Sequence, residues 1–148
     1  MRPISIIRFD QAYLSALAVG LVNTALTFEK TSTELARDPS SAQLGLGTGF
    51  LFAMLGFSFG LTLLLWFLVA RRASNVAKWI VVVLTSAGVL MGLASLMNLA
   101  AFGGLELALM LLGVGLQLTA LYFLFQRDAR EWFASKGQGG AVDPAVFD

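Results

Sequence analysis

Long apolar stretches without charge alternate along the chain with short charged segments. The apolar stretches cover residues 11–28, 46–70, 79–102 and 105–125, and Glu106 is the one charged residue within them. About 20 apolar residues suffice for a helix to cross the hydrocarbon core of a bilayer, and the first stretch is close to the lower limit. The pattern predicts an all-α membrane protein, built as an antiparallel bundle of four transmembrane helices.

The first stretch also allows a second interpretation, because a basic start followed by an apolar core is typical of a cleaved signal peptide. Arg2 and Arg8 precede it, but no clean small-x-small cleavage site lies before Glu29. The span interpretation is therefore favoured.

The basic turn Arg71–Lys78, with the sequence RRASNVAK, separates the second and third stretches. Clustered Lys and Arg resist translocation, so such a turn is expected in the cytoplasm. If the two ends of the chain lie on the same side as this turn, that side holds eight of the 10 Lys and Arg: Arg2, Arg8, Arg71, Arg72, Lys78, Arg127, Arg130 and Lys136. The opposite side holds Lys30 and Arg37. This asymmetry predicts that both termini are cytoplasmic.

Composition narrows the chemistry. The chain of 148 residues is 57% hydrophobic and 13% charged, against about 25% charged in soluble domains. It contains no Cys and no His, which excludes disulfides, a thiol nucleophile and most zinc, copper or haem ligation. A Ser nucleophile would lack a neighbouring base. We therefore expect no enzymatic activity, no metal, no cofactor and no nucleic-acid partner.

The connecting segments differ in length and character. Glu29–Gln43 is the one long polar connection, in which Thr31 and Glu34 fit a capping box for a short surface helix over Ser32–Arg37. Asp38 followed by Pro39 favours a start of the second long helix near Ser40. Asp10 stands where a helix N-cap is expected, and Ser74 or Asn75 can cap the helix that follows the basic turn. The Gly-rich tail 137–148 is expected to be disordered, which leaves residues 1–136 as a single transmembrane domain.

Small residues recur at helical spacing in every apolar stretch. Such stripes let two helix backbones approach closely, which is how helices associate in lipid. The positions predicted to pack helices are Gly49, Ala53, Gly56 and Gly60 in the second stretch, Gly88 and Gly92 in the third, and Gly113 in the fourth.

Four polar side chains form a candidate site in the outer half of the membrane. In the predicted topology Asn23, Asn98 and Glu106 come from three helices at similar depth, with Gln117 deeper on the same helix face as Glu106. An ionisable group inside a membrane is a candidate functional residue. The alternative is that Glu106, in the first turn of its helix, interacts with the helix dipole and with water.

The basic hairpin RRASNVAKW and the segment LYFLFQRDAREWF resemble a pattern found in small, uncharacterised bacterial inner-membrane proteins with four helices. The resemblance implies a location in the inner (plasma) membrane and no particular activity.

The favoured function is that of a non-enzymatic accessory or scaffold subunit, which packs through its small-residue faces against itself or another integral membrane protein. The alternative is a small channel or transporter that uses the outer polar site. A protein that protects against a membrane toxin would also fit the size, without further support in the sequence.

Overall fold

The computed structural model describes residues 2–97 and 102–136. All regular elements in these ranges are helical: α1 (Ile4–Arg37), α2 (Pro39–Gln43), α3 (Thr48–Ala70), α4 (Asn75–Ser95), α5 (Gly104–Leu124) and α6 (Arg127–Ala134). The helices α1, α3, α4 and α5 are long and apolar enough to cross a membrane. The prediction of a helical chain with four candidate spans is confirmed.

The first helix is longer than the predicted span 11–28, because both flanks continue it. Asp10 lies inside α1, so the prediction that it is an N-cap is wrong. Beyond residue 28, the hydroxyls of Ser32 and Thr33 donate to the Glu29 carbonyl within the same helix. The predicted separate helix from Ser32 is therefore part of α1, whose 34 residues span about 51 Å. This exceeds the hydrocarbon thickness of about 30 Å.

The remaining boundaries depend on local caps. Asp38 accepts from the Ser40 amide at 3.1 Å and from the Ser41 hydroxyl at 2.9 Å, and so caps α2. That helix ends at Gln43, so the long helix α3 begins at Thr48 and not near Ser40. Gly45 between them has φ +66°, a conformation that glycine adopts without strain.

Of the two predicted candidates for the cap of α4, Ser74 and Asn75, the structure uses Ser74, whose Oγ accepts from the Ala77 amide at 3.2 Å. The third predicted span, 79–102, is shifted toward the N-terminus in the structure, where α4 covers Asn75–Ser95. The fourth, 105–125, differs from α5 by a single residue at each end. The predicted disordered tail 137–148 lies outside the described residues.

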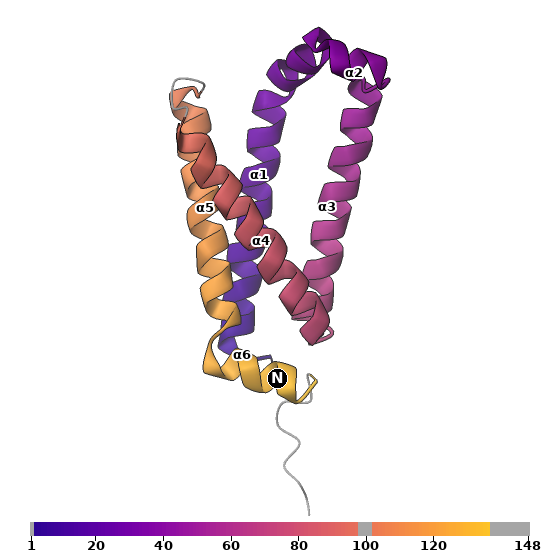
Figure 1. The fold of residues 1–148 in the computed structure, drawn as a ribbon. Helices are drawn as coiled ribbons and strands as arrows, with labels where there is room; N and C mark the ends of the chain where they lie inside the picture. Colours follow the sequence, from indigo (N-terminus) through magenta and orange to yellow (C-terminus); the bar gives the residue numbers. More distant parts are fainter. Residues whose placement is uncertain (1, 98–101, 137–148) are drawn as a thin grey trace, which may run out of the picture.

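Helices α1 and α5 lie side by side along most of their length (Figure 1). Ser5 of α1 bonds to Asp128, just after α5, whereas Lys30 pairs with Glu106 at the start of α5. These two contacts show that the helices run in opposite directions. Helix α4 crosses this pair obliquely, and α3 is joined to α1 at its upper end through α2.

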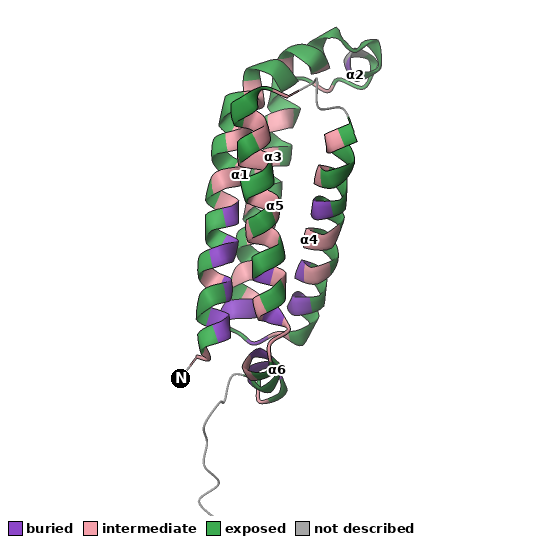
Figure 2. Cartoon of the chain, turned by 90° about the vertical axis from the view of Figure 1, so that its left-hand side faces the viewer, coloured by how far each residue is buried: buried purple, intermediate pink, exposed green. Residues whose placement is uncertain are grey.

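The hydrophobic core is concentrated at the end of the molecule that carries the N-terminus and α6 (Figure 2). Its residues come from every described helix except α2, together with the turn after α3: Ile6, Phe9, Ala12, Tyr13, Leu65, Val69, Ala73, Ala77, Val81, Ala120, Leu124, Ala129, Trp132 and Phe133. Toward the opposite end most side chains are half-buried or exposed. The two ends of the bundle therefore differ in how tightly they are packed.

Candidate functional site

At the tightly packed end, which carries most of the basic residues, Asp10 joins α1 to α3. Its carboxylate accepts from Arg2 at 2.7 Å and from the Trp66 indole nitrogen at 2.9 Å. The Asp10 side chain is only 15% exposed, so this charge is compensated at a site with limited access to water. The Asp10 carboxylate thus connects Arg2, which precedes α1, with Trp66 near the end of α3.

Helix α6 lies across the end of the bundle and closes it. Its apolar residues Ala129, Trp132 and Phe133 are buried. The Asp128 carboxylate accepts from the Ser5 amide at 3.2 Å. Burial acts to raise the pKa of Asp128, but the bonds from Ser5 and from the Ala129 amide outweigh this and hold the pKa below its ordinary value of 3.8. The charged form of Asp128 thus favours the docked position of α6.

In the middle of the molecule a cavity of about 360 Å³ lies between α1, α3, α4 and α5. Most of its wall is apolar, as in ligand pockets generally. The polar side chains on its wall are Tyr13, Ser58, Thr62, Thr85 and Gln117. These groups offer hydroxyl and amide hydrogen bonds but no charge.

The predicted outer cluster of Asn23, Asn98, Glu106 and Gln117 is brought together only in part. Asn23 and Gln117 line a second cavity, of about 170 Å³, between α1, α4 and α5. The Asn23 Oδ1 atom is buried and has no hydrogen-bond partner among the described residues. Asn98 lies outside the described residues.

Glu106 stabilises the first turn of α5. Its carboxylate accepts from the Gly103 amide at 3.3 Å and lies 3.9 Å from the Lys30 ammonium group. A carboxylate in the first turn is favoured there by the free amides and by the helix dipole. Glu106 thus has a structural role as a cap and a partner of Lys30, while Asn23 and Gln117 face the cavity.

The small-residue stripes differ in whether they face another helix of the chain. In α4 and α5 they face neighbours: a Cβ on Gly92 would lie 3.3 Å from Val114, and one on Gly113 would lie 3.9 Å from Val19. Gly88 borders both cavities. In α3, by contrast, Gly49, Gly56 and Gly60 are exposed with open space beside each, and Ala53 is exposed too. No described part of the chain lies against these three glycines, so the helix-packing role of the α3 stripe stays a prediction.

Some residues of these sites escaped the sequence analysis although a signal exists for them. Ser58 and Thr62 are four residues apart and so share a face of α3. Tyr13 and Gln117, by contrast, lie on different helices and share no such pattern. The contacts of Asp10 with Trp66, and of Asp128 with Ser5, join residues 56 and 123 positions apart. No local pattern encodes such pairings.

Within the described ranges no group of three or more acidic, His or Cys side chains is placed to hold a metal ion. Comparisons with protein-family models, with curated proteins and with solved structures give no match.

Proposed function

We propose that the chain is a multi-pass protein of the bacterial inner membrane, an antiparallel four-helix bundle with both termini in the cytoplasm. Four apolar helices and the uneven distribution of Lys and Arg support this proposal. The N-terminus and α6 also lie at the same end of the molecule (Figure 1). The resemblance to small inner-membrane proteins favours the same location.

Cysteine labelling tests this topology, because the chain has no Cys of its own. Ser40→Cys places a thiol at an exposed position in α2, and Asn75→Cys places one at the exposed first residue of α4. An impermeant maleimide added to intact cells should label Ser40→Cys alone. Labelling of Asn75→Cys from outside would contradict the proposed orientation.

Within this membrane, we propose that the protein is a non-enzymatic accessory or scaffold subunit whose binding face is the small-residue stripe of α3. The observation that carries the proposal is the direction of that stripe. Ser58 lines the central cavity, and Gly56 and Gly60 each lie two residues from it. Two residues correspond to about 200° around an α-helix. The glycines therefore lie on the side of α3 that is turned away from the bundle.

A glycine stripe on the outer surface has a definite physical use in lipid. Apolar side chains gain nothing by leaving lipid for another helix, so association depends on close van der Waals contact between backbones. The open space beside Gly49, Gly56 and Gly60 allows a helix of another subunit to make that contact. The occupant is either a second copy of this chain or a different integral membrane protein.

Affinity capture in mild detergent tests the scaffold proposal, with Gly56→Leu as the disrupting variant. Gly115 on α5 provides a matched control, since it too is exposed with open space beside it. Wild type and Gly115→Leu should retain a stoichiometric membrane partner, which mass spectrometry identifies, and Gly56→Leu should lose it. Equal capture by both variants would contradict a role for the α3 stripe.

The second candidate is a small channel or transporter, and the hydroxyl and amide side chains on the wall of the central cavity favour it. In this case the chain would form only homo-oligomers, and those oligomers would conduct ions or solutes across planar bilayers. Gln117 contributes to both cavities, so Gln117→Leu should abolish the conductance. Absence of conductance in the wild-type oligomer would exclude an ion channel.

A further inference from the structure

Lys78 and Arg130 bring two positive charges to the junction of α4, α5 and α6. The Lys78 ammonium group lies 5.0 Å from the centre of the Phe125 ring and 4.9 Å from that of Phe133, and the residue is only 6% exposed. Arg130 precedes Phe133 by three residues and so shares its face of α6. The charge of Arg130 acts repulsively on Lys78.

The acidic residues of this end are already engaged elsewhere. Asp10 binds Arg2, Asp128 binds the Ser5 amide, and Glu131 lies 3.6 Å from Arg127. Within the described part of the chain no ion pair involves Lys78 or Arg130. Aromatic rings stabilise a cation only partly, so the buried Lys78, with the exposed Arg130 as a like charge near it, favours the binding of an anion.

An apolar groove lies beside Phe125, one of the two rings that contact Lys78. It has a volume of about 500 Å³ and runs along the last turns of α5, where it is lined by Leu118, Leu121, Tyr122, Phe125 and Gln126. Phe125 belongs both to this groove and to the contact with Lys78. Trp79, which is 54% exposed, lies 6.1 Å from Phe125 with its ring edge-on.

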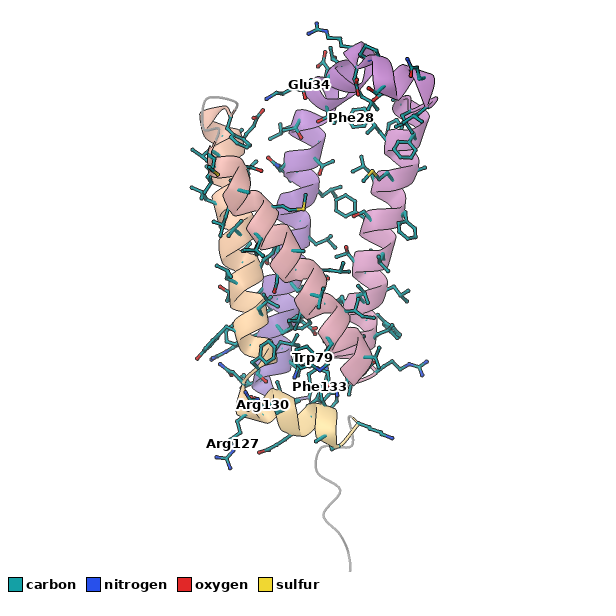
Figure 3. The ribbon with its side chains drawn as sticks, in the orientation of Figure 1. Phe28, Glu34, Trp79, Arg127, Arg130 and Phe133 are labelled. Atoms are coloured by element: carbon teal, nitrogen blue, oxygen red, sulfur yellow. The ribbon has the colours of Figure 1, made fainter. Side chains whose placement is uncertain are left out.

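The position of these groups matches a membrane interface. Trp79 lies near α6 and Arg130, at the lower end of the molecule in Figure 3. Trp is favoured at the level of lipid headgroups, and basic pockets between helices on the cytoplasmic side bind anionic headgroups. The site thus combines positive charge with the apolar groove along α5.

We propose that this junction binds one anionic phospholipid, with its phosphate between Lys78 and Arg130 and an acyl chain in the groove of α5. The proposal rests on the chain crossing a membrane, but not on the scaffold role. The two fail at different residues, because lipid binding depends on Arg130 and partner capture depends on Gly56.

Lipid titration of the purified chain in neutral detergent tests the proposal. Phosphatidylglycerol should raise Tm and appear as one bound lipid in native mass spectrometry, whereas phosphatidylcholine should do neither. Arg130→Gln should weaken the apparent affinity for phosphatidylglycerol about fivefold, as expected for one basic residue near anionic lipid. Arg127→Gln is the control, since the Arg127 side chain is 96% exposed and lies beside Glu131.

Three results would overturn the proposal. The first is an equal Tm shift with phosphatidylcholine. The second is an equal loss of affinity in the two Arg variants, which would indicate diffuse attraction to the basic surface. The third is the same stabilisation by inorganic phosphate alone, which would show that the acyl groove is not used.

The groove itself is tested by quenching of tryptophan fluorescence. Phosphatidylglycerol with brominated acyl chains should quench wild-type fluorescence, and Trp79→Phe should remove most of that quenching. Trp66, which is half-buried, and Trp132, which is 7% exposed, remain in this variant as internal references. Quenching that is unchanged by Trp79→Phe would place the acyl chain elsewhere and overturn this part of the proposal.

Discussion

The two ends of this bundle are built on different principles. At the end that carries the N-terminus, Phe9, Val69 and Leu124 are fully buried, and Asp10 and Asp128 form hydrogen bonds between helices. Toward the other end, Phe52, Phe57 and Met97 are largely exposed, and cavities separate the helices. One such cavity, of about 270 Å³, lies between α1 and α3.

This difference suggests a division of roles between stability and recognition. Polar contacts between distant helices specify a single arrangement, because each unpaired group near lipid is costly. Small residues and cavities leave surfaces that can accept another helix. We therefore expect substitutions at the packed end to change stability, and substitutions on the outer face of α3 to change association.

The largest effect is expected from Phe9→Ala, which removes a fully buried ring from the packed end. Loss of such a ring typically costs about 3–5 kcal/mol. Phe57 is the matched control because it is 72% exposed, and Phe57→Ala should change stability by less than about 0.5 kcal/mol. Thermal unfolding in detergent measures both. Similar losses at the two positions would remove the distinction between the ends.

Asp10→Asn should have the next largest effect. The substitution removes the charge that binds Arg2 and weakens the bond from Trp66. Hydrogen bonds to charged groups contribute about 1.5–3 kcal/mol, so a loss of that size is expected in unfolding free energy. The fluorescence of Trp66 should change with it, whereas Asp38→Asn, at an exposed position, should leave both unchanged. An unaltered Tm in Asp10→Asn would show that the network adds no stability.

Gly92 and Gly56 differ in the space beside them, so the same substitution should affect them differently. Gly92→Leu would drive its side chain into Val114 and should cost about 1–3 kcal/mol. Gly56→Leu enters open space and should leave the Tm of the isolated chain unchanged. Differential scanning fluorimetry of the two variants compares them directly. A destabilised Gly56→Leu monomer would mean that the α3 stripe packs within the chain.

The smallest effect concerns pH and α6. Because the pKa of Asp128 is lowered in the folded chain, its contribution to stability is present above the ordinary value of 3.8. It is lost as the pH falls through the lower folded pKa. Limited proteolysis by pepsin should then cut near α6 more readily as the pH falls. In Asp128→Asn this pH dependence should be absent, and a persistent dependence would assign it to another carboxyl group.

The sequence by itself determined the number and approximate extent of the apolar helices, because span length and hydropathy are local properties. It also limited the cap of α4 to Ser74 or Asn75, and the bond from the Ala77 amide selects Ser74. The boundaries of α1 were harder to predict from the sequence. Asp10 resembles an N-cap in sequence, but its partners Arg2 and Trp66 hold it inside a continuous helix.

The direction in which each small-residue stripe faces depends on contacts between helices, which the sequence pattern does not contain. Helical spacing shows that Gly49, Ala53, Gly56 and Gly60 share a face, but it contains no information about the neighbour on that face. In water, burial of the apolar face would settle the orientation of a helix. In lipid both faces of α3 are apolar, so the hydrophobic effect does not distinguish them, and contacts with distant residues fix the rotation of the helix.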